Sequence, residues 1–518
     1  MAPAKGIFGP ATCFNKERRV AADLPLVERD SLTTPFLSPS DGSCTDPTAL
    51  ASEANNRSRV RVETAIPYSQ GVRQTASPRN PMPLLAGPTS IRRPLGVLTA
   101  KCFLHSLRRG GCPWAFVLCD QLIVSGTSFV TTILIGRVLG KHQLGLYVLA
   151  YSVLVVLLEL QNSFIASPYT IKSPQLGPTA QARYTGSAIV LTVGLSAIAA
   201  VVLLSVGILF PSRSGVAEIR PLFLIVSLIA APLLLKEFGR RACFAHFHVR
   251  QVLLLDALGS FIQLGGMLLL LYLGVRSVRS VYWLIAGASG IAAIVWLMSW
   301  RHRTVVSLSA AILTLRETWS FGMWVLTGNL AVVLSQQVYP WYLAWLRGPD
   351  ATGAFAACTY LLALVNPLVT GVGNYLGPST ANASLHGARE LSRVVRHASL
   401  LLFLVVGVFC LAVVLFGNRF LFLLYGSGYK VDTHILVLLA AGVLALNSTL
   451  AVGFGFWAIG RPDINLKINS LAVVLAVTAG PLLVRTYGLV GAACGLLLAA
   501  SSVAALRVLF LKRVLDRR

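Results

Sequence analysis

The sequence predicts an all-α polytopic membrane protein of about twelve transmembrane helices in two six-helix lobes. Hydrophobic residues make up 55% of the 518 residues and charged residues only 12%, too few to cover a soluble globule of this length. Apolar segments recur along the chain, each close to the roughly 20 residues that a helix needs to cross hydrocarbon. A glycine pattern in the first half also returns in the second.

Residues 1–112 differ from the rest and are expected to form a disordered basic cytoplasmic tail. They are rich in Pro, Ser, Thr and Arg, hold 15 Lys/Arg and 8 Asp/Glu, and contain no apolar run long enough to span a membrane. Composition leaves two alternatives open for this tail: a segment that binds a partner, and an overlong start of the chain.

The predicted spans follow the tail and divide into an N-terminal lobe, 113–303, and a C-terminal lobe, 304–518. The spans are expected near 115–136, 144–169, 186–210, 221–239, 251–273, 280–300, 319–345, 352–377, 398–417, 434–458, 467–484 and 489–510. If they alternate from a cytoplasmic tail, 19 of the 29 Lys/Arg after residue 112 fall on the inner side. This bias predicts a multi-pass protein with both termini in the cytoplasm.

The formal charge of +25 would favour nucleic acid as the partner of a soluble protein. Here the cations fall between apolar runs, without a continuous basic stripe, so they indicate topology and no nucleic acid is expected. The nine cysteines form no CxxC pair, and no metal site or cofactor is expected. GxxxxGK[ST], HExxH and GxSxG are missing from the sequence, which argues against an ATP-driven pump or a hydrolase, and therefore for a transporter over an enzyme.

The end of the first predicted span and the end of the seventh share a glycine pattern. Gly140 and Gly145 are five residues apart, as are Gly348 and Gly353, and a shift of 208 residues relates the two pairs. The same shift carries Gln121 onto Asn329, both polar residues within spans. The pattern predicts a parallel repeat of the kind that transporters use, with the binding site between the halves.

The segment 120–170 resembles the opening of polysaccharide-lipid (O-antigen type) flippases of the multidrug/oligosaccharidyl-lipid/polysaccharide exporter superfamily. The residues that carry this resemblance are Asp120-Gln121, the turn from Arg137 to Gly140, Gly145-Leu146-Tyr147, Leu160-Gln161-Asn162 and Ser167-Pro168. Span number, parallel halves and short connections agree with that family over residues 113–518. The long tail departs from it.

The resemblance implies a V-shaped exporter fold that flips an undecaprenyl-pyrophosphate-linked oligosaccharide to the outer leaflet by alternating access. It also implies a place in polysaccharide biosynthesis, such as that of the O-antigen of lipopolysaccharide, at the bacterial inner (cytoplasmic) membrane. The expected partners are the lipid-linked oligosaccharide and membrane lipids, with other polysaccharide-assembly proteins as further candidates.

Carboxylates within spans are few, and Glu159, Asp120 and Asp256 are the candidates for coupling transport to protons or sodium. An ionisable group in hydrocarbon is costly unless it is paired or hydrated, which favours a functional role. The alternative is a structural ion pair with nearby cations such as Arg240 or Lys172. Among the three, Glu159 lies deepest and is the first choice.

The pyrophosphate needs cations, and its candidates are Arg240, Arg241, Arg250 and, at the outer mouth, Arg137. Polar uncharged side chains within spans would line a cavity for sugars: Gln121, Gln161, Asn162, Asn329, Gln336 and Gln337. The open alternative for each amide is that it only holds neighbouring helices together.

Three rival functions remain open at this stage. A proton- or sodium-coupled multidrug antiporter of the same superfamily would prefer an acidic, aromatic cavity. A membrane glycan polymerase or ligase would need a sizeable outer loop, and no predicted connection is that long. A scaffold for a biosynthetic complex would act through the tail.

Overall fold

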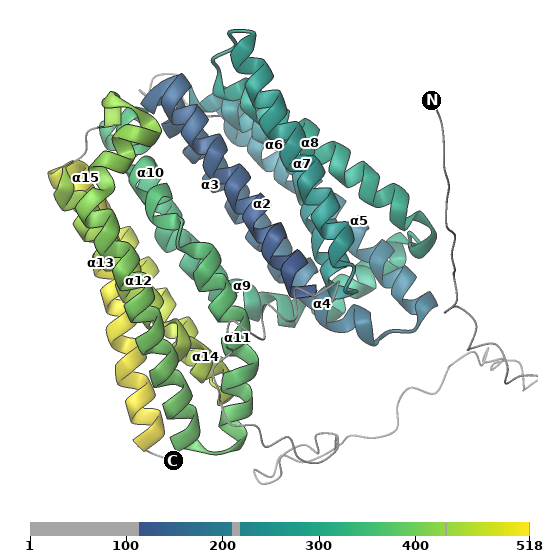
Figure 1. Ribbon diagram of the computed structural model, residues 1–518. Helices are drawn as coiled ribbons and strands as arrows, with labels where there is room; N and C mark the ends of the chain where they lie inside the picture. Colours follow the sequence, from purple (N-terminus) through teal and green to yellow (C-terminus); the bar gives the residue numbers. More distant parts are fainter. Residues whose placement is uncertain (1–112, 210–217, 430–431, 517–518) are drawn as a thin grey trace, which may run out of the picture. The chain divides into compact units, whose positions relative to one another are not determined.

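The computed structural model describes residues 113–209, 218–429 and 432–516, and all of them belong to one compact unit. These residues form helices joined by short connections, and no strand occurs among them (Figure 1). The predicted all-α membrane fold is confirmed. The tail of residues 1–112 lies outside the described residues, so its expected disorder stays a prediction.

The first set of helices, called the N-lobe below, is α2 to α8. Its elements are α2 (Pro113–Leu134), η1 (Ile135–Leu139), α3 (Gly140–Gln161), η2 (Asn162–Ala166), α4 (Ser167–Lys172), η3 (Ser173–Gln175), α5 (Pro178–Leu209), α6 (Ile219–Ala245), α7 (Val249–Tyr272), α8 (Val278–Trp300) and η4 (Arg301–Arg303). Both η1 and η2 are π-helical turns, a local widening that is frequent at functional sites.

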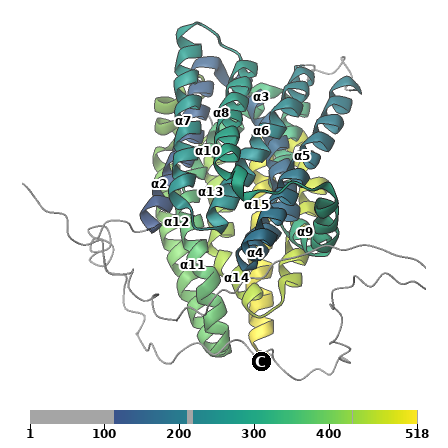
Figure 2. The ribbon, with the colours of Figure 1, turned by 90° about the vertical axis from the view of Figure 1, so that its right-hand side faces the viewer.

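The second set, called the C-lobe, is α9 to α15. Its elements are α9 (Leu308–Arg347), α10 (Pro349–Ala363), α11 (Asn366–Leu385), α12 (Ala388–Tyr425), η5 (Ser427–Tyr429), α13 (Thr433–Ser448), α14 (Leu450–Ala458) and α15 (Pro462–Asp516). Figure 2 shows the same helices after a quarter turn. In this lobe α9 packs most extensively against α15, while its first part contacts α5 and η2 of the N-lobe.

Eight helical stretches of the described chain are long and apolar enough to cross a membrane, and the bent pair α10–α11 makes a ninth. Two of the eight, Phe116–Gln175 and Pro462–Arg513, are 60 and 52 residues long and turn at Gly140 and Gly488, so each has the length of two crossings. Counting α9 as a further crossing gives the twelve that the sequence predicts. Polar residues along α9 lower its hydropathy, which fits a helix that faces a cavity instead of lipid.

Two spans expected to be continuous are broken, at positions where local chemistry weakens the helix. The helices α10 and α11 meet at a bend of 47°; Pro367, at the start of α11, has no N–H to give to the carbonyl of Ala363. Between α13 and α14, the Thr449 hydroxyl donates to Ala445 O and the Asn447 amide to Val443 O. Such side-chain bonds compete with the helical ladder.

The two glycine turns predicted to be equivalent lie against each other in the structure. A Cβ on Gly145 would overlap the carbonyl oxygen of Pro349, and a Cβ on Gly353 would overlap that of Lys141. The two contacts are exchanged by the shift of 208 residues, so the starts of α3 and α10 pack as a pseudo-two-fold pair. Glycine at both positions is what allows the two backbones to touch.

One side-chain contact follows the same symmetry. His142 on α3 and Asp350 on α10, again 208 residues apart, place Nδ1 and Oδ2 3.2 Å from each other. The repeat that the glycine spacing indicates is therefore also a physical contact between the lobes.

Candidate functional site

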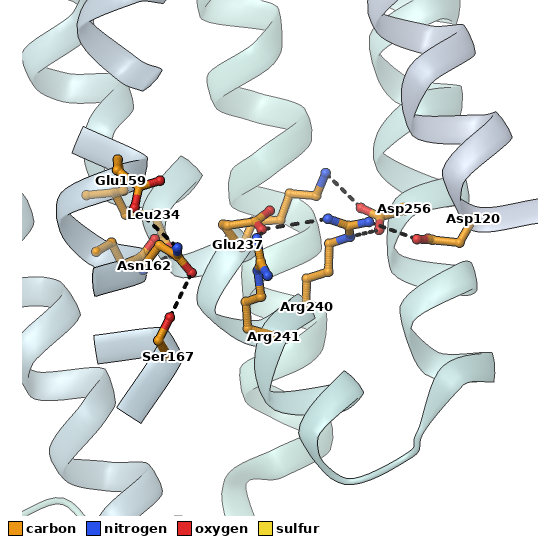
Figure 3. A network of polar contacts seen from close by, with 11 residues as sticks. Asp120, Glu159, Asn162, Ser167, Leu234, Glu237, Arg240, Arg241 and Asp256 are labelled. Carbon is orange, nitrogen blue, oxygen red and sulfur yellow. Dashed lines mark hydrogen bonds and ion pairs between the residues drawn. The ribbon is translucent and has the colours of Figure 1, made fainter. Parts of the chain in front are cut away.

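A cluster of buried charges joins three helices of the N-lobe. Arg240 of α6 donates through Nη2 to Asp120 Oδ2 of α2 at 2.9 Å and through Nε to Asp256 Oδ2 of α7 at 2.7 Å (Figure 3). Lys236 Nζ lies 3.0 Å from Asp256 Oδ1. Both aspartates are buried, at 0% and 1% exposure. The ion-pair alternative that the sequence left open for Asp120 and Asp256 is the arrangement that the structure contains.

Glu237, also on α6, extends the cluster to Arg241. Its Oε1 lies 3.1 Å from Arg241 Nε and 3.7 Å from Arg240 Nη1. Three acidic groups thus face three basic groups, and the formal charges cancel. Neither Lys236 nor Glu237 is among the candidates that the sequence indicates, although their spacing of three and four residues from the arginines places all of them on adjoining faces of one helix.

The other two arginines proposed for the pyrophosphate, Arg250 and Arg137, contact residues outside this cluster. Arg250, at the start of α7, is exposed, with its guanidinium 5.5 Å from the ring centre of Phe116. Arg137 in η1 donates through Nη1 to Leu423 O of α12 at 2.7 Å. The structure therefore does not gather the four candidates into one site.

Glu159, near the end of α3, is a half-buried carboxylate held by neutral donors. Its Oε1 accepts from Ser163 Oγ at 3.1 Å and Asn162 Nδ2 at 3.4 Å, and from Asn329 Nδ2 of α9 at 2.9 Å. The π-turn η2 begins at Asn162 and presents two of these donors. No cation pairs with Glu159 among the residues that the structure describes.

The other N-lobe amides proposed for sugars serve local contacts. Gln161 is buried and donates through Nε2 to Leu234 O of α6 at 2.6 Å. Asn162 Oδ1 accepts from Ser167 Oγ at 3.4 Å. Gln121 is half-buried on α2. None of the three belongs to the wall of the cavity described next.

A cavity of about 850 Å³ lies between α3 of the N-lobe and α9, α10, α11, α13, α14 and α15 of the C-lobe. Its wall includes seven amide side chains: Asn329, Gln336, Gln337, Asn366, Asn447, Asn465 and Asn469. Aromatic rings, among them Trp324 and Trp457, add apolar surface. Among the residues that the structure describes, no aspartate or glutamate lines the cavity. Three of the amides proposed for sugar binding, those on α9, thus share one cavity.

Within the described part of the chain, the one charged side chain in the lining is Arg507 of α15. It is only 8% exposed, and its Nε has no hydrogen-bond partner among the described residues. Arg507 is one of the 19 Lys/Arg that the alternating topology assigns to the inner side of the membrane. The sequence signal that could have marked Arg507 as functional is its position inside the last predicted span, 489–510, because a cation within hydrocarbon is costly and is often functional.

Similar folds occur among solved structures. No protein-family model matches the sequence, and no curated protein matches it. An inward-facing multidrug resistance MATE family transporter of the MOP superfamily matches with a TM-score of 0.60 and 14% identity, over 81% of this chain and 98% of that chain. A MATE transporter of Vibrio cholerae matches with a TM-score of 0.54 and 17% identity, over 78% and 95%.

A third match is a MOP superfamily transporter from Pyrococcus furiosus, for which a reverse polarity of the binding pocket suggests a different function. Its TM-score is 0.55 at 14% identity, over 79% of this chain and 97% of that chain. These neighbours agree with the exporter superfamily that the segment 120–170 resembles, and they do not single out its polysaccharide-lipid branch. The described part of the chain has the fold of the MATE transporters of the MOP superfamily.

Proposed function

We propose that this protein is an alternating-access transporter that flips an anionic lipid-linked oligosaccharide across the membrane. The observation that carries the proposal is the cavity wall, in which the described residues supply seven amides, one buried arginine and no carboxylate. Amides both donate and accept hydrogen bonds, as sugar hydroxyls require. A guanidinium binds phosphate oxygens through directed, charge-assisted bonds.

The size of the cavity suits part of such a substrate. About 850 Å³ lies within the range of sites that bury a small molecule, so it would hold the phosphate end and a few sugars. The lipid chain would remain in the bilayer. The similar transporter from Pyrococcus furiosus is also described by the polarity of its binding pocket, which is reversed and suggests a different function for that protein.

Alternating access is supported by two separate contacts between the lobes, one between α3 and α10 and one between η2 and α9. The backbones meet at Gly145 and Gly353, while the first part of α9 packs Gly322 against Phe164 of η2. Glycine contacts hold surfaces together without interlocked side chains, so they suit surfaces that separate and meet again. The resemblance of residues 120–170 to the flippases supports a place in the bacterial inner membrane, and the Lys/Arg distribution supports cytoplasmic positions for both termini.

A multidrug antiporter is the second candidate, and two observations favour it. Glu159 is a carboxylate at the lobe interface without a cationic partner in the described chain, as proton or sodium coupling would require. Trp324 and Trp457 in the cavity wall offer ring faces to an organic cation. The lack of a carboxylate in the cavity lining counts against a cationic cargo.

The test is leaflet transfer by the full-length protein in reconstituted vesicles. One set carries a fluorescent undecaprenyl-pyrophosphate-linked oligosaccharide and another the cationic dye ethidium, each with no gradient, a proton gradient or a sodium gradient. Transfer of the oligosaccharide lipid alone is the expected result. Gradient-driven movement of ethidium alone would move the protein to the multidrug function, and an enlarged glycan would indicate a polymerase or ligase.

A matched pair of variants links transfer to the cavity. Gln336→Leu removes an amide from the wall, whereas Gln175→Leu removes an exposed amide from η3, outside the cavity. We expect several-fold slower transfer for Gln336→Leu and wild-type transfer for Gln175→Leu, since losing one hydrogen bond to a sugar costs about 1 kcal/mol. Equal rates in both variants would speak against the cavity as the sugar path.

A further inference from the structure

Arg507 is a buried cation to which the described chain supplies no counter-charge. Neither a hydrogen bond nor an ion pair engages its guanidinium among the described residues, and its Nε is buried without a partner. Asp463, at the start of α15, is already paired with Arg461, Nε to Oδ1 at 3.0 Å. An isolated charge away from water is costly, so a compensating group from outside the described residues is expected at this position.

The N-lobe shows how the same chain treats a cation with a structural role. Arg240 is also mostly buried, and there two aspartates accept from its guanidinium at 2.9 and 2.7 Å. Arg507 differs from it in facing a cavity and in lacking such acceptors. The contrast indicates that the acceptor for Arg507 arrives as a ligand.

Asn465 places a second unsatisfied polar atom in the same region. Its Nδ2 donates to Gly453 O at 2.9 Å, which leaves Oδ1 as an acceptor, and this oxygen is buried without a partner. A Cβ on Gly453 would lie 3.7 Å from both Arg507 Nη2 and Asn465 Nδ2. The two side chains therefore border one small space, and Asn469 follows one helical turn along the same wall.

These groups define the chemistry of the ligand. A guanidinium binds an anionic oxygen, and a free amide oxygen accepts from a hydroxyl, so the ligand carries both close together. Phe454 and Trp457 of α14 line the same cavity and offer flat apolar faces of the kind on which a sugar ring rests. A sugar joined to a phosphate satisfies all three requirements.

We propose that Arg507 and Asn465 form the anion subsite of the C-lobe cavity, and that it takes the phosphate of a glycosyl phosphate with an adjacent sugar hydroxyl. Its role in transport rests on the proposed function, but binding is measurable without transport. The subsite lies in the C-lobe, apart from the arginines of α6 that the sequence indicated for the pyrophosphate.

The test measures binding to the full-length protein in nanodiscs of uncharged phosphatidylcholine. The probes are decyl glucosyl phosphate, its uncharged counterpart decyl glucoside, and soluble glucose 1-phosphate, each titrated by calorimetry. We expect decyl glucosyl phosphate to bind about tenfold more tightly than decyl glucoside, the preference that one charge-assisted bond supplies. Binding of glucose 1-phosphate with similar affinity would identify a free sugar phosphate as a sufficient ligand; binding of the lipid form alone would identify a glycolipid headgroup.

Variants assign the preference to the proposed residue. Arg507→Gln should abolish it, Arg507→Lys should keep part of it, and Arg513→Gln, at an exposed position of the same helix, should leave it unchanged. The melting temperature of Arg507→Gln should equal or exceed that of the wild type, because the change removes an uncompensated buried charge. A structural role for Arg507 would instead lower that temperature.

Three results would overturn the subsite. These are equal affinity for the charged and uncharged glycolipids, an undiminished preference in Arg507→Gln, and, with phosphatidylglycerol titrated as a fourth probe, equally tight Arg507-dependent binding of that lipid. Failure of the subsite and failure of the proposed function are distinguishable. If Arg507→Gln flips the oligosaccharide lipid as fast as the wild type, the subsite is wrong and the function stands. If the charged probe binds through Arg507 but no transfer occurs in vesicles, the function is wrong and the subsite stands.

Discussion

Glu159 on α3 and Asn329 on α9, 170 residues apart in sequence, join the two lobes through a hydrogen bond of 2.9 Å. The carboxylate also accepts from Ser163, and no cation neutralises it within the described chain. A bond from an amide to an ionised carboxylate is stronger than one to a neutral group. The charge on Glu159 therefore contributes directly to the contact between the lobes.

The first prediction follows from this bond. Glu159→Gln keeps an acceptor for Asn329 but removes the titratable charge, so any dependence of transfer on proton or sodium gradients should disappear. Initial transfer rates in vesicles, with each gradient imposed in turn, measure the effect. Glu317→Gln is the control. Glu317 lies on α9, as Asn329 does, but it is exposed, and its Oε2 is 4.0 Å from Lys172 Nζ. Retained gradient dependence in Glu159→Gln would remove Glu159 from the coupling role.

A second prediction concerns the neutral charge cluster of the N-lobe. Arg240→Met leaves Asp120 and Asp256 buried with only Lys236 to compensate them, and should destabilise the protein by about 3–5 kcal/mol. Arg241→Met, which breaks a half-exposed pair with Glu237, should cost about 1 kcal/mol or less. Melting temperatures of both purified variants in the same detergent provide the comparison. Similar losses in the two would mean that the aspartates do not depend on Arg240.

The sequence predicted features that depend on local sterics or on composition. The glycines at 140, 145, 348 and 353 stand out because few other residues permit such a turn or so close an approach, and their spacing led to the pseudo-two-fold contact. The amides of α9, Asn329, Gln336 and Gln337, stand out as polar residues within an apolar span, and they do line the cavity.

What the sequence could not predict depends on pairing in three dimensions. Arg240 meets Asp120 across 120 residues, so nothing local indicates that its charge is already satisfied. Arg507 presents the converse case. The rule that assigns Lys and Arg to the inner side of the membrane explained it adequately, and only the absence of a partner among the described residues reveals it as different.

A third prediction tests the backbone contact between the lobes. Gly353→Ala places a Cβ against the carbonyl oxygen of Lys141, which is backbone and cannot rotate away, so the starts of α3 and α10 must separate. The cost of such overpacking is about 1–3 kcal/mol, seen as a lower melting temperature. Gly287→Ala is the control, because a Cβ on Gly287 has open space around it. In a helix that change should be neutral or stabilising. A melting temperature of Gly353→Ala at or above that of the control would show that the two turns are not pressed together in the membrane.

The last prediction concerns pH and the connection between α6 and α7. His246 lies there with its Nε2 3.1 Å from Ser173 Oγ, and burial together with the positive charges of His248 and Arg303 holds the pKa of His246 below its usual 6.5. Below pH 6.5 the unfolded chain therefore binds a proton that the folded chain resists, and folding stability falls as the pH decreases through that range. His246→Gln retains hydrogen-bonding capacity without a titrating ring, so its melting temperature should fall less than that of the wild type between pH 7 and pH 5. Melting curves recorded at several pH values give the slope of melting temperature against pH for the wild type and for His246→Gln. Equal slopes for the two proteins would show that His246 is protonated as readily in the folded protein as in the unfolded chain.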